Sequence, residues 1–145
     1  MTIIRPMQIE DVPSVAAIER EIFSQPWSLK GFMDALSLEN TVFLVAEEGA
    51  GIVGYIGMYL SLDEGEITNV AVATEKRCRG IGAMLLSEIK KEALKRSIAK
   101  LVLEVRESNE SAIRLYKRNG FVYCGTRKGF YQLPKEDAYI MIYGQ

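Results

Sequence analysis

The chain has 145 residues, a formal net charge of −1 and 48% hydrophobic residues, which is typical of one globular domain. It contains no histidine, which excludes histidine-based catalytic triads, imidazole general bases and the usual zinc enzymes. The near-neutral charge and the lack of a long apolar run argue against a nucleic-acid partner and a membrane-spanning helix. We therefore expect one domain over residues 1–145 that binds no metal, no nucleic acid and no membrane.

The two cysteines, Cys78 and Cys124, are too far apart in the sequence to form a CxxC metal or redox pair. The first residues lack the basic-then-apolar pattern of a signal peptide. Two free thiols without an export signal favour a cytoplasmic protein, and we expect it to be a monomer.

The chain is predicted to begin with a short strand over residues 3–7 and two helices. Asp11 is expected to cap the first helix, with Pro13 in its first turn. Residues 25–27 break that helix, and Ser28 caps the second. The apolar positions at helical spacing are Val12, Val15, Ile18 and Ile22 in the first helix, and Leu29, Phe32, Met33 and Leu36 in the second.

Three β-rich runs follow, over residues 41–47, 52–60 and 66–73. The first two are joined by a glycine-containing turn at 48–51, which predicts a hairpin. Gly80 then opens a long amphipathic helix. Its apolar face consists of Ile81, Leu85, Leu86, Ile89 and Ala93.

An apolar strand is expected at 100–106, followed by a helix that Ser108 or Asn109 caps and Gly120 ends. After it come two final strands, over residues 121–127 and 138–143. Helices fall between strands at several points of this order. The sequence therefore predicts a mixed α/β fold, with a central sheet of about seven strands and about four helices covering both faces.

The strongest functional signal is the strand end Asn69-Val70-Ala71-Val72, followed by Arg77-Cys78-Arg79-Gly80-Ile81-Gly82 at the start of the long helix. Glycines at a strand-to-helix junction let a ligand approach the backbone. The free N–H groups and the dipole of the helix start favour an anion there. The alternative is a plain turning loop. The run is neither a P-loop nor a dinucleotide-binding fingerprint, because it lacks Gly-Lys-Ser/Thr and the third glycine.

This run resembles the pyrophosphate loop of GNAT acetyltransferases, Q/R-x-x-G-x-G/A, and the similar element order extends over nearly the whole chain. Asn109 and the helix end Tyr116-x-x-x-Gly120-Phe121 add to the resemblance. It implies acetyl-coenzyme A as co-substrate, with its pantetheine arm along the strand and its pyrophosphate on the loop. The residues that it assigns to the coenzyme are Val70, Ala71, Val72, Arg77, Cys78, Arg79, Gly80, Ile81, Gly82, Ala83 and Asn109.

A finer resemblance is to the RimI branch of that family. It rests on the segments Gln25-Pro26-Trp27-Ser28, Leu103-Glu104-Val105-Arg106, Ser108-Asn109 and Glu136-Asp137-Ala138, the last preceded by Tyr131. RimI enzymes acetylate the N-terminal alanine of the eighteenth small-subunit ribosomal protein. The resemblance therefore implies the N-terminal peptide of a ribosomal protein as the acceptor. Cys78 in the loop and Phe130, where other members often have tyrosine, depart from the pattern.

Glu104 is the candidate general base, because it is the one carboxylate in an otherwise apolar strand. The alternative is a half-exposed carboxylate, or one paired with Arg106. Tyr116 is the candidate general acid for the departing thiolate, and the alternative is a core tyrosine on its helix. No neighbouring base suggests a nucleophilic cysteine, so we expect direct transfer within a ternary complex.

Trp27, Tyr131 and the acidic stretch 64–66 are candidates for the acceptor groove. Core or lid residues, and a solvated acidic turn, are the alternatives. Two other functions also fit the sequence. One is a small-molecule amine acetyltransferase, for example of polyamines, and the other is a coenzyme A-binding module without turnover.

Overall fold

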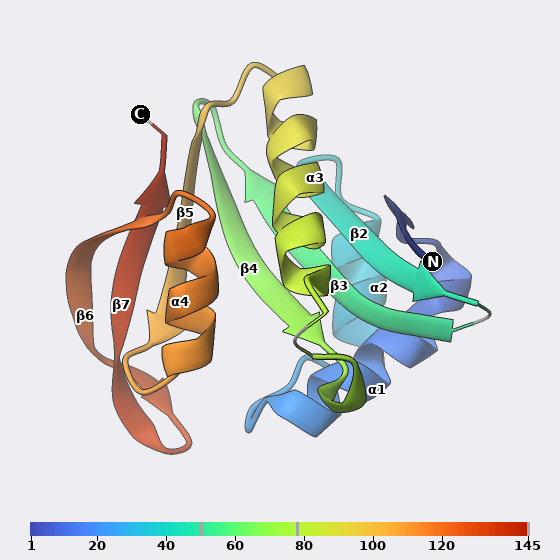
Figure 1. Cartoon of the computed structure of the whole chain (residues 1–145), viewed down its shortest axis with the longest axis horizontal. Helices are drawn as coiled ribbons and strands as arrows, with labels where there is room; N and C mark the ends of the chain where they lie inside the picture. Colours follow the sequence, from blue (N-terminus) through green and yellow to red (C-terminus); the bar gives the residue numbers. More distant parts are fainter. Residues whose placement is uncertain (50, 78, 145) are drawn as a thin grey trace.

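The computed structural model of the protein describes residues 1–49, 51–77 and 79–144 (Figure 1). The helices in these residues are α1 (Val12–Ile22), α2 (Leu29–Leu36), α3 (Ile81–Lys95) and α4 (Glu110–Arg118), with short 3₁₀ turns at Ile9–Asp11 and Thr74–Lys76. The strands are β1 (Thr2–Pro6), β2 (Thr41–Glu48), β3 (Gly51–Leu60), β4 (Glu64–Val72), β5 (Lys100–Arg106), β6 (Val122–Gln132) and β7 (Lys135–Tyr143). The predicted order of helices and strands is confirmed.

The strands form one sheet of seven strands in the order β1-β2-β3-β4-β5-β7-β6. Only β4 and β5 are parallel, and α3 connects them; every other neighbouring pair is antiparallel. Helices α3 and α4 cover one face of the sheet, and α1 and α2 cover the other (Figure 1). The expected mixed sheet with helices on both faces is therefore the observed architecture.

Each face of the sheet has its own hydrophobic core. Under α3, the side chains of Leu85, Leu86 and Ile89 are completely buried against β2–β5 and β7. On the opposite face, Val12 and Val15 of α1 pack with residues of α2 and β2–β4. The helical spacing of these apolar residues brings them to one side of each helix, which is why the amphipathic pattern predicted both helices.

Three of the predicted helix ends are confirmed. The Ser28 hydroxyl accepts a hydrogen bond from the Gly31 N–H at 3.0 Å, and the Asn109 side chain accepts one from the Ala112 N–H at 3.3 Å. Gly120 follows α4 with a φ of 90°, a conformation that favours glycine.

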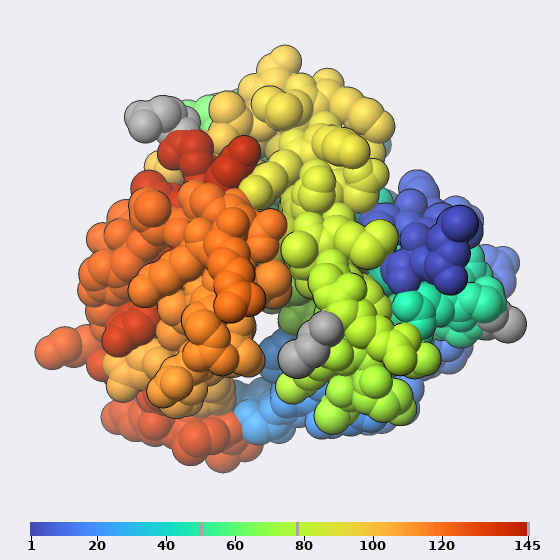
Figure 2. All heavy atoms as spheres, viewed as in Figure 1, coloured from blue at the N-terminus to red at the C-terminus, as the bar shows by residue number. Residues whose placement is uncertain are grey.

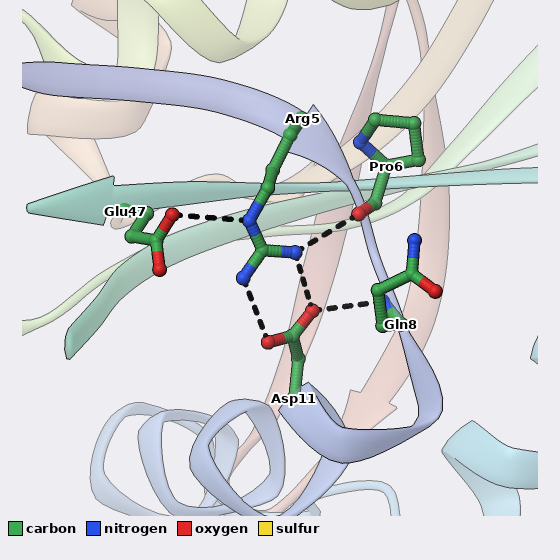
Figure 3. A network of polar contacts seen from close by, with 5 residues as sticks. All are labelled: Arg5, Pro6, Gln8, Asp11 and Glu47. Carbon is green, nitrogen blue, oxygen red and sulfur yellow. Dashed lines mark hydrogen bonds and ion pairs between the residues drawn. The ribbon is translucent and has the colours of Figure 1, made fainter. Parts of the chain in front are cut away.

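The expected cap of α1 by Asp11 is wrong in its chemistry. Asp11 occupies the position before α1, but its side chain makes no hydrogen bond to that helix. Its carboxylate instead accepts a hydrogen bond from the Gln8 N–H at 2.8 Å and pairs with both terminal nitrogens of Arg5, at 2.7 and 2.9 Å (Figure 3). Arg5 also contacts Glu47 at 3.1 Å, so the network joins β1, the 3₁₀ turn and β2. A charged partner on the neighbouring strand outcompetes the local cap.

The last two strands are longer than predicted. β6 continues to Gln132 and β7 begins at Lys135, so their hairpin extends five residues and three residues, respectively, past the expected strand limits of 127 and 138. Residues 128–137 include no buried residue. Because this part of the hairpin has no buried face, its sequence needs no alternation of apolar and polar residues, which is the pattern by which a half-buried strand is recognised. β4 likewise begins at Glu64 rather than at residue 66.

Candidate active site

The sheet opens between β4 and β5. The two strands pair from Glu64 opposite Lys100 to Ile67 opposite Leu103, and beyond this point they no longer pair with each other. β4 continues to Val72 and β5 continues to Arg106, each paired only on its other edge, with β3 and β7 respectively. Figure 1 shows the two strands diverging there, and Figure 2 shows the surface hollowed between α4 and the start of α3. The backbone of both strands is thus available to a ligand.

A β-bulge in β4 determines which groups face this opening. Gly57 of β3 lies opposite Asn69 and Met58 lies opposite Ile67, so Thr68 is the extra residue. After the bulge, Ala71 packs with the α1–α2 core and Val70 and Val72 pack with the α3 core.

The backbone groups of Val70 and Val72 point into the opening. Ala73 donates its N–H to the Val53 carbonyl on β3 at 2.8 Å. Because residues of an antiparallel strand alternate between bonding to the partner and pointing away from it, the N–H and C=O of Val70 and Val72 point toward β5. The Val72 carbonyl also accepts a long hydrogen bond, 3.4 Å, from Arg77 Nε.

At the start of α3, three backbone N–H groups have no partner within the helix or among the described side chains. The first intrahelical bond runs from the Met84 N–H to the Gly80 carbonyl at 3.0 Å. No side chain caps the residues before it, so the N–H groups of Ile81, Gly82 and Ala83 have no intrahelical partner. Gly80 itself has a φ of 77° and open space where a Cβ would be. The geometry fits an anion at this point of the described chain.

Gly82 also has a packing role. A Cβ on Gly82 would lie 2.8 Å from Cδ2 of Leu115, so this glycine allows α3 to pack closely on α4. The packing leaves its backbone N–H without an intrahelical partner. Cys78, which the resemblance also assigns to the loop, lies outside the described residues.

Two basic residues before α3 are partly neutralised by one acid of β2, and of the two Arg79 is exposed while Lys76 is half-buried. Arg79 lies 3.6 Å from the Glu48 carboxylate, and Lys76 lies 3.5 Å from it. The Arg79 side chain is 55% exposed, so its charge is available to a ligand at little cost.

Glu104 lies on β5 beside the opening, with a side chain that is only 15% exposed. Its Oε2 accepts a hydrogen bond from Arg127 of β6 at 2.9 Å. Pairing with Arg106, the alternative in the sequence, is therefore wrong. Desolvation and the charges of Glu104 and Glu64 raise the pKa of Glu66 on β4, so these acids lie close together.

Tyr116 is 7% exposed on the inner side of α4, with its ring 5.9 Å from that of Phe121. Burial raises the pKa of Tyr116 above its ordinary value, and Tyr131 raises it further. The phenol therefore keeps its proton at neutral pH. Asn109 begins the same helix, where its side chain serves as the cap.

Trp27 and Tyr131 have different surroundings. The Tyr131 ring lies 4.3 Å from the guanidinium of Arg106, which is two residues after Glu104 on the same side of β5. Burial and the charge of Glu104 raise the pKa of Tyr131 to about 12. Trp27 packs against Phe32 at 5.2 Å between ring centres and lines a surface hollow of about 450 Å³ beside α2. The structure records no contact between these two described side chains.

A buried polar network that the sequence did not predict holds the Trp27 segment. Glu19 of α1 is 3% exposed, and its carboxylate accepts hydrogen bonds from the Trp27 N–H at 3.0 Å and from the Tyr55 hydroxyl. Asn69, which follows the bulge, is also buried, and accepts a hydrogen bond from the Thr68 hydroxyl at 2.6 Å. The sequence signal that could have indicated this network is a polar residue within an apolar segment, because a buried polar group needs a hydrogen-bond partner.

The sequence matches the model of the acetyltransferase (GNAT) family over residues 12–121. The chain belongs to the GNAT acetyltransferase family. Its mixed sheet, with an opening between β4 and β5, is the GNAT fold that the resemblance implied.

Two curated relatives of this GNAT protein match almost its full length. The putative ribosomal protein bS18-alanine N-acetyltransferase of Bacillus subtilis is 36% identical over 140 residues, which are 95% of this chain and 92% of that protein. The ribosomal protein bS18-alanine N-acetyltransferase of Escherichia coli strain K12 is 33% identical over 143 residues, 97% of this chain and 96% of that protein.

Solved GNAT structures have the same fold. The ribosomal-protein-S18-alanine N-acetyltransferase of Escherichia coli superposes with a TM-score of 0.90 at 32% identity, covering 99% of this chain and 94% of that one. PaiA N-acetyltransferase from Thermoplasma acidophilum, solved with coenzyme A, has a TM-score of 0.86 at 21% identity and covers 100% and 99%.

The described residues of this GNAT chain hold no group of three or more Cys, Asp or Glu side chains placed to bind a metal ion. Within residues 1–49, 51–77 and 79–144, no helix has the length and apolarity to span a membrane.

Proposed function

We propose that this protein transfers the acetyl group of acetyl-coenzyme A to the N-terminal α-amine of alanine in ribosomal protein bS18. The observation that carries the proposal is the full-length similarity, at 33% and 36% identity, to proteins named for this reaction. The opening between β4 and β5 supports it, because it offers unpaired backbone beside a carboxylate and a phenol.

The coenzyme fits the unpaired groups of this site. In the proposed complex its pantetheine amides continue the sheet by bonding to the backbone of Val70 and Val72, with Ala71 between them and Asn109 opposite. Its pyrophosphate binds the free N–H groups at the start of α3, near Arg77 and Arg79.

Glu104 takes the proton of the acceptor amine, directly or through a water, as the nitrogen attacks the thioester carbon. The carbon–sulfur bond then breaks, and the Tyr116 phenol donates its proton toward the departing sulfur. A thiol has a pKa of about 8.5, well below that of a buried tyrosine. Proton transfer from Tyr116 is therefore uphill, and its hydrogen bond to the developing thiolate contributes first.

An α-amine is the acceptor that asks least of this base. Its pKa is about 7.7–8.0, against about 10.4 for lysine. At pH 7 roughly a tenth of an α-amine is already neutral, but less than about a thousandth of a lysine amine is. A site with one carboxylate base is therefore better matched to a protein N-terminus than to a lysine side chain.

Trp27 and Tyr131 are proposed to contact the acceptor peptide. Tyr131 lies on the Glu104 side of the site, with its ring against Arg106. Trp27 follows α1, and its backbone N–H is held by the buried carboxylate of Glu19 in that helix. The acids at 64 and 66 on β4 are suited to a basic peptide.

The test is mass spectrometry of an alanine-starting bS18 peptide after incubation with the protein and acetyl-coenzyme A. We expect one added acetyl group on the α-amine. The matched control is the same peptide with its α-amine already blocked, which should gain nothing even if it contains lysine. Acetylation of polyamines but not of the peptide would overturn the proposal.

A further inference from the structure

The tip of the β6–β7 hairpin is attached to the site mainly through one side chain of β5, Arg106. Its Nη1 donates hydrogen bonds to the Pro134 carbonyl at 2.8 Å and to the Glu136 carboxylate at 3.0 Å. Its Nη2 donates to the Leu133 carbonyl at 3.2 Å. The guanidinium carbon also lies 4.3 Å from the ring centre of Tyr131. One planar group thus contacts four residues of the tip.

Apart from Arg106, the hairpin tip makes few contacts with the rest of the protein. Residues 128–137 include no buried residue, and the pairing of β6 with β7 is irregular between Arg127 and Tyr131. Strand pairs without an apolar face are marginal by themselves in water. Besides the contacts of Arg106, the Glu107 N–H donates a hydrogen bond to the Asp137 carbonyl at 3.2 Å, at the base of the tip. The bond from the Gly129 N–H to the Asp137 carboxylate, 2.8 Å, lies within the tip.

The same clamp reaches the start of α4. The second oxygen of Glu136 accepts a hydrogen bond from the Ser108 N–H at 2.7 Å. Arg106 and Ser108 together hold the pKa of Glu136 below its ordinary value, so the carboxylate is charged at neutral pH. The side chains of Arg106 and Glu136 are 22% and 13% exposed, so water screens their charges less than at an open surface.

We propose that Arg106 is a positioning residue, which clamps the hairpin tip so that Tyr131 is held beside Glu104 as a wall for the acceptor peptide. The effect on the acceptor rests on the proposed function. The clamp itself does not depend on it. Arg106 contacts no reacting group, and it acts through the place of Tyr131.

A charge alone does not make these contacts. The guanidinium has donors in a fixed planar fork, and three of its bonds here go to oxygens of three different residues while its face rests on an aromatic ring. Lysine at this position keeps the charge but cannot reach all of these partners at once. Arg106→Lys therefore separates the clamp from simple electrostatics.

The first experiment measures the hairpin without any substrate. Hydrogen exchange of the backbone amides of residues 128–136 is followed by mass spectrometry in the wild type, Arg106→Ala and Arg106→Lys. The control is Arg96→Ala, because the Arg96 side chain, at the exposed end of α3, pairs with Glu92 at 3.0 Å and with no other described acid. We expect exchange about 10-fold faster in Arg106→Ala, with an intermediate rate for lysine and none of this change in the control.

The second experiment compares the Michaelis constants of the two substrates. In Arg106→Ala, the KM for the alanine-starting peptide should rise about 10-fold, and the KM for acetyl-coenzyme A should stay at the wild-type value. Millimolar guanidinium should restore part of the peptide affinity in Arg106→Ala and change nothing in the wild type or in Arg96→Ala. If Arg106→Ala does not fold, Arg106→Lys is judged by the same two ratios.

Wild-type exchange rates in Arg106→Ala, or an equal rise of both KM values without rescue, would overturn the clamp. A wild type that acetylates no peptide would instead overturn the proposed function. The exchange measurement would still decide whether Arg106 holds the hairpin.

Discussion

Gly82, in the first turn of α3, lies directly against Leu115 of α4. A Cβ on Gly82 would be 2.8 Å from Cδ2 and 3.5 Å from Cδ1 of Leu115. Leu115 precedes Tyr116, so the helix start proposed to bind pyrophosphate and the helix that carries the candidate acid share a contact.

Gly82→Ala is expected to shift Leu115 and with it α4. Overpacking costs about 1–3 kcal/mol, and alanine recovers about 1 kcal/mol of helix propensity, so the free energy of unfolding should fall by about 1 kcal/mol. We also expect weaker binding of acetyl-coenzyme A, measured by calorimetry. The control is Gly125→Ala, because the position has open space for a Cβ. In Gly82→Ala/Leu115→Ala the clash is gone, so the combined loss should be smaller than the sum of the two single losses. Strictly additive losses would contradict the contact.

Glu104→Gln is expected to lower kcat by about 10²-fold or more, because a positioned general base contributes about 10²–10⁴-fold. The deficit should shrink as pH rises past about 8, where the α-amine is neutral without help. Steady-state rates from pH 6 to 9 measure both effects. The control is Arg127→Met, which removes the ion pair at 2.9 Å but keeps the carboxylate. If Arg127→Met lost as much activity as Glu104→Gln, the ion pair and not proton transfer would explain the loss.

Tyr116→Phe is expected to lower kcat while the protein keeps its stability. The phenol is buried and its pKa is raised above the ordinary value of 10.0, so it remains a proton donor at neutral pH. Removing the hydroxyl removes only that donor, and the ring still packs on Phe121. Pre-steady-state release of coenzyme A should slow with no change in thermal unfolding. An unchanged kcat would exclude Tyr116 as the acid.

Tyr55→Phe is expected to destabilise the protein by about 1–3 kcal/mol, because it leaves one oxygen of the buried Glu19 carboxylate without its donor. Urea unfolding measures the change. The matched control is Tyr123→Phe, since the Tyr123 hydroxyl pairs only with Thr126 at the surface, at 2.7 Å. Equal stability of the two variants would mean that the network around Glu19 contributes nothing.

The pair of Arg5 and Asp11 is expected to lose its contribution in acid. The Arg5 guanidinium holds the pKa of Asp11 below its ordinary value of 3.8. The stabilisation is therefore fully present above that value and is lost as pH falls below it, through the pKa of the folded state. Asp11→Asn should cost about 1–2 kcal/mol at pH 7, and the difference from the wild type should narrow below pH 3.8. A difference that stays constant from pH 7 to pH 3 would contradict this account.

Whether a feature could be predicted from the sequence depends on how far apart in the chain its interacting residues are. Ser28 and Asn109 meet the N–H groups that they cap three residues later, and Gly120 sets its own backbone angle. Such features follow from a few neighbouring residues, so they were predictable. Asp11 failed as a cap because its partners lie on β1 and at Gln8, in the direction away from the helix.

In the candidate site, too, the local features were predictable and the contacts between distant residues were not. The strand end at Val70–Val72 and the glycine at 80 were visible in the sequence, because a phosphate-binding helix start needs only local residues. The partner of Glu104 was not visible, since Arg127 lies 23 residues away on a strand whose register depends on the whole sheet. The side that Glu66 and Thr68 face also depends on the bulge, which appears only when β4 pairs with β3.

By itself, the sequence determined the order of the helices and strands, their buried faces and the helix start that we propose to bind an anion, because hydrophobic periodicity and helix ends are local properties of the chain. Only the tertiary structure decided where β4 and β5 separate, that Arg127 pairs with Glu104, and that Arg106 holds the hairpin. Those contacts join residues that pairing and packing of distant strands bring together, and no local pattern encodes that meeting.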